Sequence, residues 1–122
     1  MRRSGTACTA AWLVFSLTAC GETHESTAQS VARAEAMTPT EPRLAEIYAR
    51  TCRACHVNPD SGAPLTGNKA AWRQRIAAGR PTVEANMRNG LRTMPPRGQC
   101  LDCSDADLWS LTLFMAQQEP PR

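Results

Sequence analysis

Residues 52 to 56 of this 122-residue chain read Cys-Arg-Ala-Cys-His, and they carry its most specific chemical pattern. Two thiols separated by two residues, followed directly by a histidine, form the attachment motif of a c-type haem. The thiols of Cys52 and Cys55 would add to the two vinyl groups of the haem, and His56 would then ligate the iron from below the ring. A reduced thiol pair or half of a zinc site is the alternative that the pentapeptide alone leaves open.

Length and cysteine content limit the elements that can position these residues. A chain of this length is expected to form one domain, and such a small domain buries little apolar surface. It therefore usually needs a disulfide, a metal or a cofactor for stability. Six cysteines indicate an oxidising compartment, cofactor attachment or both. The formal net charge of +3 is ordinary.

The N-terminus predicts export. A short basic segment precedes an apolar run at residues 10–17, which is too short to span a bilayer, and residues 17–20 read Leu-Thr-Ala-Cys. This ending resembles the lipobox of bacterial lipoproteins, which implies cleavage after Ala19 and a diacylglycerol on Cys20. A signal peptide that is cut near Cys20 without lipidation is the alternative.

Four regions are expected along the chain. They are a lipoprotein signal peptide at 1–19, a flexible polar tether at 20–40, a monohaem domain at 41–119 and a tail at 120–122. Residues 30–37 could form a transient helix, and His24 is expected to be a solvated histidine. Gly21 resembles a sorting signal for the outer membrane. We therefore expect an anchor on the periplasmic side of a bacterial membrane, with the outer membrane favoured.

Between residues 41 and 119 the apolar residues recur at helical spacing, and no stretch shows the alternation of a β-strand. Two prolines and two glycines make residues 58–67 a loop. Asn68 and Ser104 are candidate helix caps. The expected fold is all-α, with about four short helices around one covalent haem. These helices are predicted at about 42–51, 69–78, 83–89 and 105–118.

Met94 is the candidate for the second axial ligand of the iron. It lies in an irregular segment and is followed by two prolines. A thioether sulfur is a soft ligand, and histidine–methionine ligation raises the reduction potential of a haem. Met87 and Met115 instead have the spacing of core residues on helix faces, and Met37 falls in the expected tether.

The domain resembles the class I c-type cytochromes, most closely the cytochrome c5 group of bacterial monohaem proteins. The resemblance covers about residues 48–115. It rests on Tyr48 with Cys52, Cys55 and His56, on Gly62-Ala63-Pro64 with Thr66-Gly67, on Lys69-Ala70-Ala71-Trp72, on Met94-Pro95, and on Gly98 with Cys100 and Cys103-Ser104-Asp105. The resemblance implies an all-α fold in which the first and last helices of the domain cross near the haem edge, with Tyr48 and Phe114 at the crossing.

The same resemblance assigns roles around the haem. The carbonyl of Pro64 would accept a hydrogen bond from Nδ1–H of His56, which would hold the ring and raise its basicity. Trp72 would pack beside the haem and could reach a propionate, or would only fill the core. Val57 departs from the family, which usually has glycine there, so the loop that carries Pro64 could run differently.

Cys100 and Cys103 are expected to form a structural disulfide, both from the oxidising compartment and from the resemblance. A bond that closes so short a loop would stabilise the chain by about 2 kcal/mol and would stiffen the turn after Met94. The alternative is thiol–disulfide exchange, because such a pair before a helix start is also the arrangement of oxidoreductases. Cys8 would be lost with the signal peptide.

Two surface patterns suggest a partner. Residues 69–97 contain seven basic residues and one acid. Arg92 and Arg97 flank Met94 and could steer an acidic redox partner toward the haem edge, or could simply be solvated and balance nearby acids. Trp109 and Leu113 replace residues that are usually polar in the family. They are expected to form a partner patch or to pack against the tether.

We therefore expect a membrane-tethered periplasmic cytochrome that carries single electrons between redox proteins of a respiratory chain. No serine–histidine–aspartate or paired-carboxylate arrangement points to an enzyme, and nucleic acid is not an expected partner. Three alternatives remain open from the sequence. They are a haem enzyme or gas-binding protein with a displaceable Met94, a thiol–disulfide oxidoreductase that uses Cys100 and Cys103, and a lipoprotein without haem.

Overall fold

The computed structural model describes residues 25–118 of the chain, and most of these residues lie in short helices. Their bounds are α1 Thr27–Ala36, α2 Pro42–Ile47, η1 Tyr48–Cys52, α3 Arg53–His56, η2 Pro59–Ser61, α4 Lys69–Ile76, α5 Arg80–Asn89, η3 Pro96–Gln99 and α6 Asp105–Ala116. Between residues 25 and 118 the only β-type pairing is an isolated bridge between Leu91 and Met94. The expected all-α fold is confirmed. Cys8, Cys20, Gly21 and His24 lie outside the described residues.

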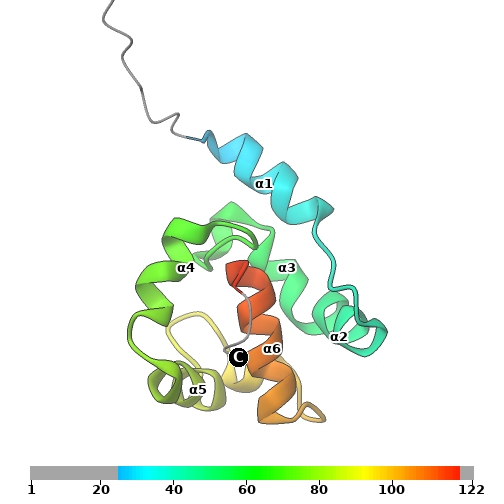
Figure 1. The fold of residues 1–122 in the computed structure, drawn as a ribbon, viewed down its shortest axis with the longest axis vertical. Helices are drawn as coiled ribbons and strands as arrows, with labels where there is room; N and C mark the ends of the chain where they lie inside the picture. The colour runs from blue at the N-terminus through cyan, green and yellow to red at the C-terminus, as the bar shows by residue number, and fades with distance from the viewer. Residues whose placement is uncertain (1–24, 119–122) are drawn as a thin grey trace, which may run out of the picture.

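Helix α6 runs through the middle of the domain, between α3 on one side and α4 and α5 on the other (Figure 1). It crosses the continuous helical run formed by α2, η1 and α3. At the crossing the rings of Tyr48 and Phe114 pack edge to face, with their centroids 5.2 Å apart. Arg43 of α2 donates to Asp107 at the start of α6 over 3.0 Å. The two residues expected at the crossing are therefore in contact.

The helix boundaries follow local chemistry. Ser104 and Asp107 form a reciprocal capping box that begins α6, as the sequence predicted. Asn68 caps α4 through its side-chain oxygen, which accepts from the amide of Ala71. Helix α6 ends at Ala116, earlier than expected, because Gln117 adopts a left-handed conformation with φ 51°. Such a residue cannot continue a right-handed helix.

The core corrects one expectation about the surface. Trp109 and Leu113 are both buried and belong to the main hydrophobic cluster, so they do not form an exposed partner patch. The guanidinium of Arg80 covers the Trp109 ring, 5.0 Å from its centroid. A side chain from α5 therefore supplies the cover that the sequence left to a partner or to the tether. The apolar side chain that the disulfide turn does expose is Leu101, with 89% of its surface accessible.

Helix α1 differs from the expected flexible tether. Ten residues of that segment form a helix, which begins with a capping box between Ser26 and Gln29. Its Ala34 is fully buried, and the carbonyl of Glu35 accepts a hydrogen bond from Arg53. Capping and burial of a small-residue face thus order a stretch whose composition alone indicated a solvated coil.

Gly67 is where α1 meets the domain. A Cβ on Gly67 would lie 2.7 Å from Sδ of Met37 and 2.9 Å from Cδ of Arg33. Gly67 also has φ +82°, and its amide donates to the carbonyl of Met115 over 2.7 Å. A side chain at this position would displace Met37 and Arg33 and would strain the left-handed backbone. None of the helices between residues 25 and 118 is long and apolar enough to cross a bilayer.

We expect Gly67→Ala to loosen α1. The left-handed conformation alone should cost about 1–2 kcal/mol, and the new methyl group should also push Met37 and Arg33 outward. Gly79→Ala is the matched control, because Gly79 has φ +85° but meets no side chain closer than 3.9 Å. Hydrogen exchange should therefore become faster in α1 for the first variant and remain unchanged there for the second. Equal exchange in both would show that Gly67 does not hold α1.

Candidate functional site

His56 ends α3 with its ring buried, and only 6% of the residue is accessible. Its Nδ1 lies 2.8 Å from the carbonyl oxygen of Pro64. A carbonyl can only accept, so Nδ1 carries the proton and the other ring nitrogen, Nε2, keeps its lone pair. Within residues 25–118 that nitrogen has no hydrogen-bond partner. The predicted hydrogen bond to Pro64 is present, even though Val57 replaces the usual glycine.

The electrostatics of the site keep the imidazole of His56 neutral. Burial lowers its pKa, the hydrogen bond to Pro64 partly opposes this, and the positive charge of Arg75 lowers it further. A neutral imidazole with one nitrogen already committed is the form that ligates a metal ion. The ring also stacks on Trp72, with centroids 5.4 Å apart and planes inclined by 26°. Two contacts therefore fix its orientation.

The loop that carries Pro64 is tied to α3 at both ends. The hydroxyl of Ser61 donates to the carbonyl of Cys55 over 2.7 Å. At the other end, the amide of Thr66 donates to the carbonyl of His56 over 2.8 Å. The Tyr48 hydroxyl and the Thr66 hydroxyl share a buried hydrogen bond of 2.9 Å. These bonds hold the loop against the histidine that it orients.

Trp72 helps to hold the same loop. Its indole N–H donates to the carbonyl of Leu65 over 2.9 Å. The nitrogen that could have reached a haem propionate is thus already bonded to the backbone. Of the two roles left open by the sequence, the structure has Trp72 packed in the core and stacked on His56.

The two cysteines of the motif form no disulfide within residues 25–118 and differ in exposure. Cys52 ends the π-helical segment η1 and is half-buried, whereas Cys55 is exposed on α3. Burial raises the pKa of the Cys52 thiol, although a hydrogen bond with Thr51 partly opposes this. Both residues lie on the same continuous helical run, which ends at His56.

Met94 is held by backbone contacts. Its amide and carbonyl each pair with Leu91, both over 3.0 Å. A Cβ on Gly90 would come within 2.8 Å of the Met94 carbonyl, so this turn requires glycine. The side chain of Met94 is half-buried against the same core cluster as Cys52.

The sulfur of Met87, in contrast, is buried and accepts a hydrogen bond from Thr112 over 3.0 Å. Met87 is therefore a core residue, as expected.

This donor set suits a haem c. It could supply two thiols for the vinyl groups, an imidazole with one nitrogen left for iron, and a thioether as a second iron ligand. The structure brings His56, Pro64 and Trp72 into direct contact, and it packs Cys52 and Met94 against one core cluster. All five residues were candidates from the sequence.

Cys100 and Cys103 form a disulfide in the structure, with their Cα atoms 5.5 Å apart. Asp102, between them, is bound through both carboxylate oxygens by Arg50 of η1, at 2.8 and 2.7 Å. Sequence reasoning missed this link, because the two residues lie 52 positions apart. The bonded sulfurs also rule out Cys100 and Cys103 as thiolate ligands, although they and Asp102 lie close enough to hold a metal ion.

Several arginines of the basic segment are already paired with acids, and Arg97 is one of them. Its guanidinium donates to Asp105 and to the carbonyl of Cys103. Arg88 also pairs with Asp105, and Arg80 pairs with Glu84. Four basic residues of the segment have no carboxylate partner within salt-bridge distance between residues 25 and 118, namely Lys69, Arg73, Arg75 and Arg92. The unpaired positive charge therefore lies on α4 and at Arg92, beside Met94.

The fold and the donor set define a class I c-type cytochrome, and comparison with known proteins agrees. Residues 39–115 match the family described as cytochrome C oxidase, cbb3-type, subunit III. Cytochrome c5 of Ectopseudomonas mendocina is 42% identical over 65 residues, which cover 52% of this chain and 75% of that protein. Cytochrome c5 of Azotobacter vinelandii is equally similar over 65 residues, covering 52% of this chain and 78% of that protein.

Cytochrome c-555 of Chlorobaculum tepidum is 33% identical over 75 residues, which cover 58% of this chain and 69% of that protein. No solved structure matches this chain. Because the family match covers more than half of the chain, the chain belongs to this family of c-type cytochromes. It is a carrier of electrons on a covalently bound haem c, and not an enzyme.

We expect Trp72→Phe to destabilise the domain by about 0.5–1.5 kcal/mol, because it removes the indole hydrogen bond to the Leu65 carbonyl, which then keeps only the amide of Asn68 as a donor. Trp109→Phe is the matched control. The indole N–H of Trp109 is buried and has no hydrogen-bond partner among residues 25–118, so its loss removes no such bond. Denaturant unfolding of the two variants measures the difference. An equal loss of stability in both would contradict a role of the Leu65 bond in holding the loop.

Proposed function

We propose that this cytochrome works in the periplasm, anchored by lipid, and passes single electrons between larger redox proteins of a respiratory chain. Cys52 and Cys55 would bind the haem covalently, and His56 and Met94 would ligate its iron. The contact between Nδ1 of His56 and the Pro64 carbonyl carries this proposal, because it leaves only Nε2 for a metal. The position of both cysteines on the same helical run, outside any disulfide within residues 25–118, supports the covalent attachment.

The surrounding residues suit a carrier whose ligands stay in place. When bound, the haem supplies the one-electron couple between Fe(III) and Fe(II). The Pro64 carbonyl and the Trp72 ring hold His56 in one orientation. The paired hydrogen bonds to Leu91 hold the backbone of Met94. A rigid ligand set of this kind keeps the structural change that accompanies electron transfer small.

Arg92 is our candidate for steering an acidic partner. It is exposed, lies two residues before Met94, and has no carboxylate partner between residues 25 and 118. Leu91 beside it is also exposed. A cation and an apolar side chain next to the axial ligand suit a transient redox partner, whose encounter is accelerated by charge.

The anchor is proposed from residues 17–20, Leu-Thr-Ala-Cys. Lipidation of Cys20 with two or more acyl chains would give stable attachment, whereas one chain gives marginal binding. The tether between Cys20 and α1 would then be much shorter than expected from composition, because the structure has a helix over Thr27–Ala36. Gly21 supports the outer membrane as the location.

We expect Met94→Ala to abolish the weak long-wavelength absorption band of a methionine–Fe(III) bond. The reduced protein should then bind carbon monoxide rapidly, and its reduction potential should fall by on the order of 0.1 V. Met87→Ala is the matched control and should keep the band, because Met87 packs in the core. If the wild type lacks the band and binds carbon monoxide rapidly, Met94 is not a bound ligand and the carrier proposal fails.

Cys20→Ala should release the protein from the membrane. Cells supplied with labelled palmitate should label the wild-type protein, and the variant should carry no label. Membrane fractionation followed by haem staining measures both effects. A wild-type protein that remains unlabelled would contradict lipidation and favour the unlipidated signal peptide.

A further inference from the structure

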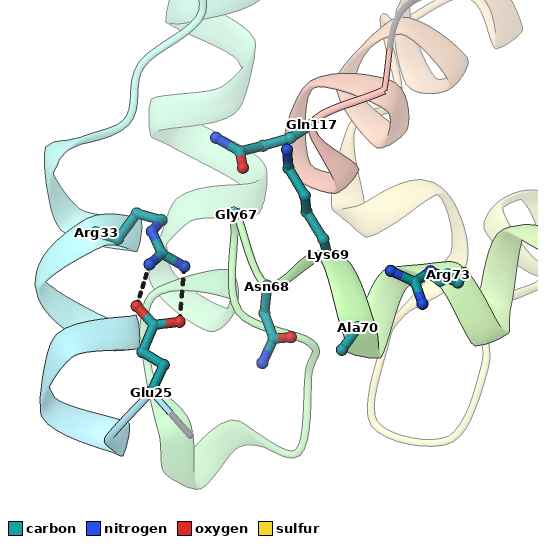
Figure 2. Close-up of a pocket in the computed structure, with 8 residues that line it drawn as sticks. All are labelled: Glu25, Arg33, Gly67, Asn68, Lys69, Ala70, Arg73 and Gln117. Atoms are coloured by element: carbon teal, nitrogen blue, oxygen red, sulfur yellow. Dashed lines mark hydrogen bonds and ion pairs between the residues drawn. The ribbon is translucent and has the colours of Figure 1, made fainter. Parts of the chain in front are cut away.

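A cleft of about 510 Å³ lies between α1 and the start of α4, outside the residues that we assign to the haem. Figure 2 shows Arg33 and Glu25 on its α1 side and Lys69 and Arg73 on its α4 side. The Lys69 side chain extends toward Gln117, just after α6. Residues before 39 lie outside the family match, so α1 adds a wall that the matched domain lacks.

The cleft carries unbalanced positive charge. Arg33 forms a paired ion bridge with Glu25, so these two residues cancel each other. Lys69 and Arg73 are exposed, and neither has a carboxylate partner between residues 25 and 118. They lie four residues apart on one face of α4, where their side chains are neighbours. Two adjacent cations beside an open cleft suit a phosphate group.

The position of the cleft in the chain indicates where the phosphate comes from. Glu25, at the edge of the cleft, lies five residues after the proposed lipid cysteine, Cys20. Five fully extended residues span at most about 17 Å. A lipid on Cys20 would therefore keep Lys69 and Arg73 near the headgroup layer, where anionic lipids attract basic side chains.

We infer that the cleft between α1 and α4 docks on the membrane, with Lys69 and Arg73 binding the phosphate of an anionic phospholipid headgroup. This inference rests on the lipid anchor proposed above. Docking would orient the molecule. The segment that contains Met94, yellow in Figure 1, lies beside α5 and away from α1. The redox ligand would then face away from the lipid, toward partners in the periplasm.

Vesicle flotation of the purified mature holoprotein tests the inference. Vesicles of phosphatidylcholine alone are compared with vesicles that contain phosphatidylglycerol, at low and high salt. Each cation near an anionic surface contributes roughly fivefold to partitioning. Lys69→Gln combined with Arg73→Gln should therefore lower the gain from phosphatidylglycerol by roughly 25-fold. Arg88→Gln combined with Arg92→Gln is the matched control, since it removes the same charge and should keep most of that gain.

The outcomes separate this inference from the anchor. A control that loses as much as the Lys69 and Arg73 variant would overturn the inference, because the effect would then come from net charge. Inorganic phosphate could also abolish the increase in vesicle binding that phosphatidylglycerol causes, by saturating the cleft at millimolar concentration. That result would overturn the inference in favour of a site for free phosphate. A wild-type protein that does not bind vesicles of phosphatidylcholine alone, but binds once phosphatidylglycerol is added, would refute the lipid anchor. The same result would support the binding of the cleft to anionic lipid.

Discussion

The hydrogen bond between Nδ1 of His56 and the carbonyl of Pro64 is the contact on which the site depends. It fixes the tautomer of a buried imidazole and leaves the other nitrogen available to the iron that His56 is proposed to ligate. A single carbonyl can do this only if its loop is rigid. Bonds from Ser61 to Cys55 and from Thr66 to His56 tie that loop to α3 at both ends. The loop and the haem motif therefore form one unit.

The rest of the domain supports this unit with few residues. Helix α6 crosses the run that contains the haem motif, and the amide of Gly67 bonds to its Met115 carbonyl. At the other end of α6, the disulfide between Cys100 and Cys103 and the pair of Arg50 with Asp102 fix the turn that precedes it. A small domain with a limited core gains from such local ties, and a covalent cofactor adds another.

Local chemistry made much of this structure predictable. The haem motif, the capping box of α6 and the bond to Pro64 depend on residues that lie close together in the chain or that match a family pattern. Contacts between distant residues were not predictable. The cover of Trp109 by Arg80 and the bond of Arg50 to Asp102 both join residues that lie far apart in the chain. The composition of α1 indicated a coil, because its order comes from capping and from its approach to Gly67.

The proposed function depends on covalent attachment of one haem through Cys52 and Cys55. Intact-mass measurement of the purified protein, followed by mapping of the peptide that contains residues 52–56, tests this most directly. We predict a mass increase of one haem, located on that peptide, and no alkylation of either cysteine. A peptide of unmodified mass in which both thiols react with the alkylating reagent would contradict the account.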